Sequence, residues 1–214
     1  MPKRIYLIRH GETEGSLNGL FVGSLDLPLL PRGVEQVERL AALLPAHLGT
    51  ATVTDGAPGG VCCVASPLLR AQQSAAAIAR RFGLPVVTDP DLREVDFGAW
   101  EGLTPAQIEE RYPGQLARWA SPSEEMGFPG GETIWQFDAR VRRALGCILA
   151  HPAEVALVVA HGGVVRRLAC DLLRAPEGMF WLFAVRPASI VRIDLSDPGP
   201  MLCELWSVAD REQG

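Results

Sequence analysis

Near its beginning the chain carries the stretch Ile5-Tyr6-Leu7-Ile8-Arg9-His10-Gly11-Glu12-Thr13, a short apolar run that leads directly into Arg-His-Gly. A second apolar run, residues 155–159, leads in the same way into Ala160-His161-Gly162-Gly163. Both runs have the length and the continuous apolar character of strands buried in a parallel sheet. Open parallel sheets bind ligands at the carboxyl ends of their strands, so we expect both histidines to lie at one such crevice.

Strands and helices are expected to alternate along the chain. Apolar residues at helical spacing predict a helix over residues 32–47 whose buried face includes Val34. Ser66-Pro67 has the residue types of an N-cap and a first helical position, and it predicts a helix from there to about residue 82, with Arg70 in its first turns. The other predicted strands are residues 3–8, 61–65, 85–88, 155–160, 189–195 and 201–208, and the other predicted helices are residues 104–120, with a break at Pro113, 132–150 and 164–173.

This order of elements predicts the α/β fold class, in three α/β/α layers with a mostly parallel sheet and helices on both faces. All 214 residues are expected to form one domain. The two loosest stretches, residues 49–60 and 121–131, are too short to link independent domains, so we expect surface loops there.

The composition limits the functions that the chain can have. With 48% hydrophobic and 21% charged residues it is typical of a soluble globular domain, and a net charge of -5 provides no basic face for nucleic acid. We therefore expect a small partner, and Arg9-His10-Gly11, which sets a guanidinium beside a nucleophile, favours a small phosphorylated substrate. No run approaches the roughly 18 apolar residues of a membrane span, and the first run is too short for a signal peptide, which favours a cytoplasmic protein without a membrane partner. The sequence leaves open whether the chain is a monomer or a homodimer.

The cysteines are odd in number and show no Cys-x-x-Cys spacing. We therefore expect buried free thiols and neither a disulfide framework nor a zinc site. The five residues are Cys62, Cys63, Cys147, Cys170 and Cys203.

Several residues near the predicted strand ends have the chemistry of phosphoryl transfer. That reaction needs an in-line nucleophile, cations around the phosphoryl oxygens and an acid for the leaving oxygen. His10 would attack through a neutral ring nitrogen while its other nitrogen donates to a fixed acceptor such as a loop carbonyl. Arg9 and Arg70 would bind phosphate oxygens as forks, and His161 would act as a second cation or as a donor.

Glu94, in Leu92-Arg93-Glu94-Val95-Asp96-Phe97-Gly98, is the candidate proton donor. To act as an acid near neutral pH it must keep its proton, which an apolar pocket or a bound phosphate dianion would favour. Once ionised, the same carboxylate could take a proton from the water that hydrolyses a phosphohistidine.

The motifs that carry these residues resemble, in their order, those of the histidine phosphatase superfamily, which includes the cofactor-dependent phosphoglycerate mutases. The resemblance covers about residues 3 to 195, and its motifs are Arg9-His10-Gly11-Glu12-Thr13, Ser66-Pro67-Leu68-Leu69-Arg70-Ala71, Leu92-Arg93-Glu94 with Phe97-Gly98-Ala99-Trp100-Glu101-Gly102, Pro129-Gly130-Gly131-Glu132-Thr133 and His161-Gly162-Gly163. It implies a phosphoglycerate mutase-like fold, phosphorylation of His10 and proton donation by Glu94. It also implies a phosphate pocket of Arg9, Arg70 and His161, with no metal and no other cofactor.

The loop after the nucleophile departs from the family pattern. Ser16 stands where members often carry Asn, and Val22 stands before Gly23 where polar substrate contacts are common. We predict Ser16, Gly23 and Gly162 as further substrate-binding residues, since a hydroxyl or a backbone amide can donate to phosphate. The role of Glu12 stays open between substrate binding and support of the loop.

Within the superfamily, residues 19–23, 32–36 and 179–185 look most similar to the α-ribazole-5'-phosphate phosphatases of cobalamin synthesis. This resemblance implies that substrate, with aromatic side chains near the site to pack its base. A broad-specificity phosphatase is an alternative. A phosphoglycerate mutase is another, but four acids against two bases in residues 104–128 disfavour a doubly charged substrate. A catalytically silent binding protein of the same fold, and a zinc site made by His10, Glu94 and His161, are the remaining alternatives.

Overall fold

The computed structural model describes residues 1–48, 60–120 and 126–208, which form a three-layer α/β fold around one mixed sheet. The sheet has six strands in the order β3-β2-β4-β1-β5-β6. They are β1 (Arg4–Arg9), β2 (Val61–Ala65), β3 (Val86–Thr88), β4 (Val155–Ala160), β5 (Ser189–Ser196) and β6 (Gly199–Ser207). The first four run parallel to one another, whereas β5 is antiparallel to β1 and β6 is antiparallel to β5. The predicted fold class is therefore confirmed.

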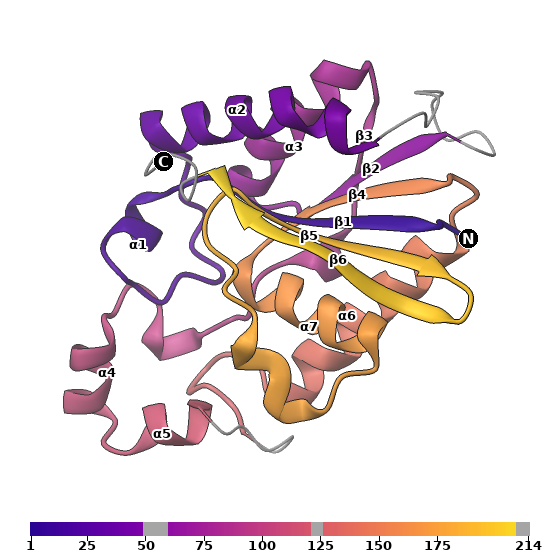
Figure 1. The fold of residues 1–214 in the computed structure, drawn as a ribbon. Helices are drawn as coiled ribbons and strands as arrows, with labels where there is room; N and C mark the ends of the chain where they lie inside the picture. The colour runs from indigo at the N-terminus through magenta and orange to yellow at the C-terminus, as the bar shows by residue number, and fades with distance from the viewer. Residues whose placement is uncertain (49–59, 121–125, 209–214) are drawn as a thin grey trace.

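Helices cover both faces of the sheet (Figure 1). On one face lie α2 (Pro31–Leu48) and α3 (Leu69–Phe82), and on the other lie α6 (Ile134–Ala150) and α7 (Gly162–Leu173). The short elements are α1 (Glu14–Leu17), η1 (Pro90–Leu92), η2 (Gly98–Trp100), α4 (Pro105–Arg111), α5 (Gln115–Ala120) and η3 (Glu177–Leu182). Of these, α1, α4 and α5 lie beyond the carboxyl ends of the parallel strands, where ligand sites of such sheets are found (Figure 1).

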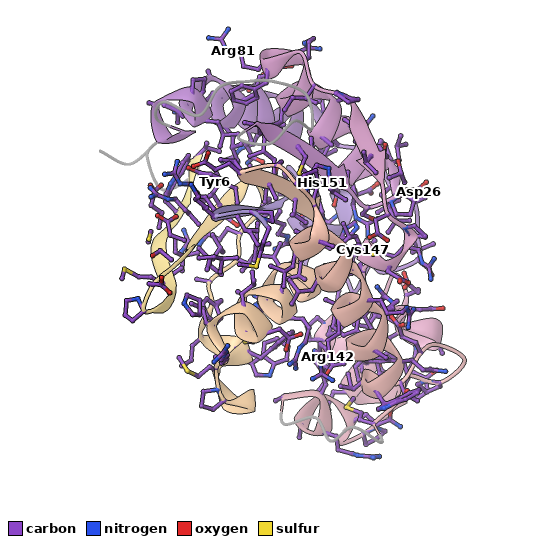
Figure 2. The ribbon with its side chains drawn as sticks, turned by 90° about the vertical axis from the view of Figure 1, so that its right-hand side faces the viewer. Tyr6, Asp26, Arg81, Arg142, Cys147 and His151 are labelled. Atoms are coloured by element: carbon purple, nitrogen blue, oxygen red, sulfur yellow. The ribbon has the colours of Figure 1, made fainter. Side chains whose placement is uncertain are left out.

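The two faces of β1 explain why its sequence is apolar at successive positions. Side chains alternate between the faces of a strand. Ile5 and Leu7 are buried in the core under α6 and α7, whereas Tyr6 and Ile8 are buried in the core under α2 and α3. Figure 2 shows Tyr6 inside the molecule at the sheet. A strand covered on both faces needs a continuous apolar run, as the sequence predicted.

Two details of the predicted helices are wrong. Val34 is 45% exposed, because Gly33 occupies the buried position of that turn and packs against the backbone of Glu12. The helix predicted from Ser66 begins instead at Leu69, since the Ser66 hydroxyl accepts from the amide of Leu68 and contacts His161. The tertiary contact of this hydroxyl thus replaces a local helix cap.

The break predicted at residue 113 is confirmed, because α4 and α5 are separate helices. The helix predicted from residue 132 begins at Ile134, where Thr133 is the N-cap and its hydroxyl accepts from the amide of Gln136. The predicted loop over residues 49–60 lies outside the described residues except at Gly60, and residues 121–125 of the other loop also lie outside them.

All five cysteines are free, but the expectation that all are buried is wrong for two of them. Cys147 lies on the outer side of α6, where Figure 2 also labels Arg142, and Cys203 lies on the edge strand β6. Both elements have one face directed to solvent, which apolar spacing alone did not reveal.

Candidate active site

His10 and His161 lie side by side at the carboxyl ends of adjacent parallel strands. β1 and β4 pair up to Arg9 and Ala160, and the His10 amide donates to the Ala160 carbonyl at 3.0 Å. The centroids of the two imidazole rings are 5.2 Å apart, and the residues are only 4% and 0% exposed. The two histidines are therefore neighbours at the strand ends, as the two apolar runs predicted.

The contacts and burial of His10 favour a neutral ring. Its Nδ1 lies 2.7 Å from the Gly11 carbonyl oxygen, which can only accept, so Nδ1 carries the proton and Nε2 keeps a lone pair. Burial, with the charges of Arg9 and Arg70 adding to it, holds the pKa of His10 well below 6.5. The turn behind the ring needs glycine, because a Cβ at Gly11 would lie 2.3 Å from the carbonyl oxygen of Gly33.

The contacts and burial of His161 also favour a neutral ring. Its Nδ1 accepts from Arg70 Nε at 3.2 Å, so its Nε2 carries the proton and donates to the Ser66 hydroxyl at 2.7 Å. Burial first, and then the charges of Arg70, His10 and Arg9, hold its pKa well below 6.5. The ring therefore bonds to Arg70 and Ser66, and its predicted role toward a phosphate, as a second cation or as a donor, stays a prediction.

Backbone carbonyls fix the guanidinium of Arg70, which is 1% exposed. Its Nη1 donates to the Leu25 carbonyl at 2.8 Å and its Nη2 to the Gly23 carbonyl at 2.9 Å. A Cβ at Gly23 would lie 1.6 Å from the Val95 carbonyl oxygen, so only glycine fits this contact. Because neutral acceptors orient the fork, no carboxylate cancels its charge by direct contact within the described residues.

Glu101 ties two loops of the site together, and sequence reasoning missed it. Its carboxylate accepts from the amides of Gly23 at 3.0 Å, Ser24 at 2.8 Å and Phe97 at 3.2 Å. The amide of Gly23 is therefore used inside the protein, and the residue acts on Arg70 through its carbonyl. No sequence pattern signalled this, since Glu101 lies 78 residues after Gly23 in the chain.

One guanidinium nitrogen of Arg9 donates to a backbone carbonyl, and another is buried without a partner among the described residues. Its Nη1 donates to the Val185 carbonyl at 2.8 Å, whereas its buried Nε has no hydrogen-bond partner among the described residues. Burial lowers the pKa of Arg9 to about 10, with the charge of Glu94 opposing and those of Arg166 and Arg70 adding to the shift. Arg9 is thus charged at neutral pH and carries an unused donor, as an anion-binding residue requires.

The Glu94 carboxylate lies on the turn that follows His161. Its Oε2 accepts from the amide of Gly163 at 3.0 Å, and its Oε1 accepts from the amide of Val95 at 3.1 Å. A Cβ at Gly163 would lie 2.6 Å from Oε1, so a side chain there would push the carboxylate away. The predicted acid and the two histidines are therefore brought together.

Arg166, in the second turn of α7, is a site residue that sequence reasoning missed. Its Nε donates to the Phe183 carbonyl at 3.0 Å, while its two terminal nitrogens have no hydrogen-bond partner among the described residues. A Cβ placed on Gly162 would lie 3.4 Å from Arg166 Nη1 and 3.5 Å from Arg9 Cζ, so both guanidinium groups approach this glycine. The i+4 spacing from Gly162 on a helix that starts at the site could have revealed it.

Five aromatic side chains form a continuous group beside Arg166, which we call the aromatic wall. Its members are Phe21, Phe97, Trp119, Phe180 and Trp181. They meet edge to face, with ring centroids 5.1 Å apart for Phe21 and Phe97 and 5.1 Å apart for Trp119 and Trp181. The Arg166 Cζ lies 5.6 Å from the Trp181 ring centroid, and Trp181 is 40% exposed. The wall therefore joins the Arg166 side of the site to solvent.

The Ser16 side chain and the Glu12 backbone are hydrogen-bonded around the loop after His10. The Ser16 hydroxyl donates to the Thr13 carbonyl at 3.0 Å and accepts from the Thr13 amide at 2.9 Å, in a capping box of α1. The backbone amide of Glu12 donates to the Gln36 side chain at 3.0 Å. The hydroxyl proton that a phosphate contact would need from Ser16 is thus already donated, and that contact stays a prediction.

Within residues 1–48, 60–120 and 126–208, no three His, Cys, Asp or Glu side chains are grouped as metal ligands would be. Both ring nitrogens of His161 are also engaged, by Arg70 and Ser66. This arrangement does not match the zinc alternative, in which His10, Glu94 and His161 would all turn a lone pair to one ion. In the same described ranges, no helix is long and apolar enough to cross a membrane.

Comparison with known proteins gives the chain a family. Residues 5–207 match the histidine phosphatase superfamily (branch 1). A bifunctional protein of Mycobacterium tuberculosis is 36% identical over 190 residues, which are 88% of this chain and 49% of that protein, so the chain spans about half the length of this relative. The adenosylcobalamin/alpha-ribazole phosphatase of Escherichia coli K12 is 31% identical, with 90% of each chain covered. The crystal structure of the alpha-ribazole phosphatase from Shigella flexneri has a TM-score of 0.76 and 29% identity, over 94% of this chain and 95% of that one.

Proposed function

This chain belongs to the histidine phosphatase superfamily, and from that premise we propose that it hydrolyses phosphomonoesters through a phosphohistidine at His10. The observation that carries the proposal is the His10 ring, whose Nδ1 proton is fixed on the Gly11 carbonyl so that Nε2 is free to attack. Arg9 and Arg70 bring positive charge to the same pocket, and the unused Nε of Arg9 offers a donor to a phosphoryl oxygen.

In the first step, His10 Nε2 attacks phosphorus in line with the ester oxygen. The bond from phosphorus to that oxygen breaks, the oxygen takes the electron pair, and a proton from Glu94 converts it to the free alcohol. In the second step, a water oxygen attacks the phosphohistidine while the Glu94 carboxylate takes its proton. The P–N bond returns its electron pair to Nε2, inorganic phosphate leaves, and Glu94 is protonated for the next cycle.

For the substrate, we propose a monoester whose alcohol carries a planar apolar group, with α-ribazole-5'-phosphate as the first candidate. The aromatic wall includes Phe97, three residues after Glu94, and reaches Trp181, which packs against Arg166. Flat rings of this kind bind planar groups by stacking or by edge contacts. The Escherichia coli relative is named for the same ester, which supports this choice.

We also propose that the reaction needs no metal ion and takes place in the cytoplasm. Arg9 and Arg70 already supply positive charge for a phosphoryl group, and the Nε of Arg9, unpartnered among the described residues, supplies a donor. The five free cysteines fit a reducing compartment. Full activity in the presence of a strong chelator would support the first statement, and loss of activity that added zinc or magnesium restores would contradict it.

Trapping the intermediate tests the mechanism. Brief incubation with a 32P-labelled monoester, followed by a quench in denaturant, is expected to leave an acid-labile, base-stable label on His10. The His10→Ala variant should show neither label nor turnover. A label on serine or cysteine, or turnover by His10→Ala, would refute the mechanism.

A metal-free panel of α-ribazole-5'-phosphate, 3-phosphoglycerate, sugar phosphates and simple monoesters tests the substrate. A preference of at least about tenfold in kcat/KM for α-ribazole-5'-phosphate is expected, which corresponds to about 1.4 kcal/mol. Equal kcat/KM values across the panel would contradict the preference and leave a broad-specificity phosphatase. Transfer of phosphate between hydroxyls of a phosphoglycerate, without release, would identify a mutase instead.

A further inference from the structure

Arg140, on α6, uses every donor of its side chain, three of them on the loop that carries Glu94 and two on Glu132. The residue is 5% exposed, and its guanidinium has five N–H groups. Nε donates to Glu132 Oε2 at 3.0 Å, Nη2 to Glu132 Oε1 at 2.5 Å and the Glu94 carbonyl at 2.9 Å, and Nη1 to the carbonyls of Asp91 at 2.9 Å and Arg93 at 2.5 Å. Three backbone carbonyls in and next to the acid's position are thus held by one side chain.

Glu132, two residues before α6, also binds the loop that carries Glu94. Its Oε1 also accepts from the amide of Asp96 at 2.9 Å, and its own amide donates to the Asp96 carbonyl at 3.1 Å. The Arg140–Glu132 pair therefore binds the backbone on both sides of Glu94. Residues 91–96 lie outside the sheet, so no hydrogen bonds between strands fix their backbone.

Stability alone is a poor explanation for this pair. Removing two charges from water is costly, and a buried ion pair often gives little net stabilisation over apolar residues of similar size. Beyond their contact with each other, both side chains form hydrogen bonds with the backbone of residues 91 to 96. A catalytic acid must be held within tenths of an ångström of its target. Hydrogen bonds from neighbouring side chains to the backbone of the acid can hold it that closely.

We propose that Arg140 and Glu132 are positioning residues, which fix the backbone of Glu94 so that its carboxyl group reaches the leaving oxygen of the substrate. This inference rests on the proposed role of Glu94 as the acid. It predicts that weakening the pair harms the reaction only where the leaving group needs a proton.

Arg143 provides a matched control one helical turn further along α6. Its guanidinium donates to both carboxylate oxygens of Asp91 at 3.0 Å, so it ties the same helix to the same loop. It is 63% exposed in its side chain and makes no contact with Glu94 among those the structure shows. Arg143→Gln therefore removes a tie to the loop without touching the acid's own backbone.

The test compares kcat/KM for an alkyl phosphate and for 4-nitrophenyl phosphate, whose anion leaves without a proton. kcat/KM reports the steps up to the phosphohistidine, so it isolates the step in which the acid acts. For Glu94→Gln we expect a loss of about 100-fold with the alkyl ester and less than about fivefold with the aryl ester. For Arg140→Lys we expect kcat/KM to fall about 10- to 30-fold with the alkyl ester and less than about threefold with the aryl ester. The reason is that one ammonium group cannot replace the planar guanidinium, which donates in several directions.

Two further measurements make the outcome unambiguous. Glu132→Gln keeps the acceptor oxygen for Asp96, so it should show a smaller loss of the same selective kind even if Arg140→Lys folds poorly. In the double variant Glu94→Gln with Arg140→Lys, the lysine should add little to the loss with the alkyl ester, because the group that it positions is already absent. Arg143→Gln should change neither rate by more than about twofold.

Equal losses on both esters for Arg140→Lys and Glu132→Gln, or losses that add fully to that of Glu94→Gln, would overturn the positioning role. If Glu94→Gln itself loses both esters equally, the acid role fails and this inference fails with it. A selective loss for Glu94→Gln without one for Arg140→Lys and Glu132→Gln would overturn only the inference and leave the proposed function intact.

Discussion

Lowering the pH below 6.5 is expected to destabilise this protein through its two buried imidazoles. Burial is the main cause that holds the pKa of both His10 and His161 well below 6.5, and nearby guanidinium groups add to it. In the unfolded chain each ring takes a proton as the pH falls through about 6.5, whereas in the folded protein it stays neutral. Below about pH 6.5 the unfolded state then binds more protons than the folded state, so the free energy of unfolding decreases as the pH is lowered.

The size of the effect follows from the protons that the two states bind. An unfolded imidazole that is half protonated at pH 6.5 and almost fully protonated at pH 5.5 favours unfolding by about 1 kcal/mol over that interval. Two rings give about 2 kcal/mol, and the slope approaches about 1.4 kcal/mol per pH unit for each ring below pH 5.5 until the folded ring also titrates. Domains are stable by only about 5–15 kcal/mol, so a loss of this size is measurable.

Urea unfolding at pH 7.0, 6.5, 6.0 and 5.5 tests this, in buffers free of phosphate, which would stabilise the folded state by binding. The quantity of interest is the difference in unfolding free energy between the wild type and His161→Gln, because carboxylates that titrate in the same range affect both proteins alike. This difference should fall by about 1 kcal/mol from pH 6.5 to 5.5, and the same should hold for His10→Gln. A difference that does not change with pH would show that these rings are not held neutral.

Three substitutions test other parts of the site. Arg166→Met should lower kcat/KM for α-ribazole-5'-phosphate about tenfold and for a small alkyl phosphate less than about threefold, since it removes contacts on the side of the alcohol; a uniform loss would place Arg166 on the phosphoryl group. Gly163→Ala should reduce turnover of alkyl esters more than of 4-nitrophenyl phosphate, because its Cβ would lie 2.6 Å from Glu94 Oε1; unchanged selectivity would contradict this. Gly23→Ala should lower the thermal midpoint by the equivalent of about 1–3 kcal/mol, because its Cβ would meet the Val95 carbonyl at 1.6 Å; an unchanged midpoint in a thermal scan would argue against this packing.

The sequence predicted the parts of the site that depend on strand ends. Apolar runs mark buried strands, and a residue directly after such a run must lie at the sheet edge, so the positions of His10 and His161 follow from the runs themselves. Family membership, predicted from the five motifs, is confirmed over residues 5–207. Arg70 also lies in the first turn of its helix as expected, although that helix begins at Leu69, two residues after the predicted first position at Pro67.

The contacts between distant segments could not be predicted in this way. Arg140 and Glu132 are eight residues apart on the chain, but their joint target is a loop some forty residues earlier. Helical spacing places Arg140, three residues after Phe137 and four before Ala144, on the buried face and leaves Arg143 exposed, but it does not show which backbone Arg140 binds. At Ser66 the local pattern gave a wrong prediction. It favoured a helix cap, whereas the hydroxyl contacts His161 in the folded protein. Local patterns report periodicity and propensity, whereas these roles depend on which segments meet in space.

In this protein, the group that accepts hydrogen bonds from an arginine determines whether its positive charge stays available to a ligand. Arg140 donates to a carboxylate, which cancels its charge and leaves it the task of holding backbone. Arg70 and Arg9 donate to carbonyls instead, so they are oriented but keep their charge for a ligand. Charge that is already oriented needs little reorganisation when a phosphoryl group develops negative charge, and that is the condition under which electrostatic stabilisation of a transition state is largest. The combination of carbonyl-held arginines with a neutral His10 therefore favours attack on a phosphoryl anion over simple binding of it.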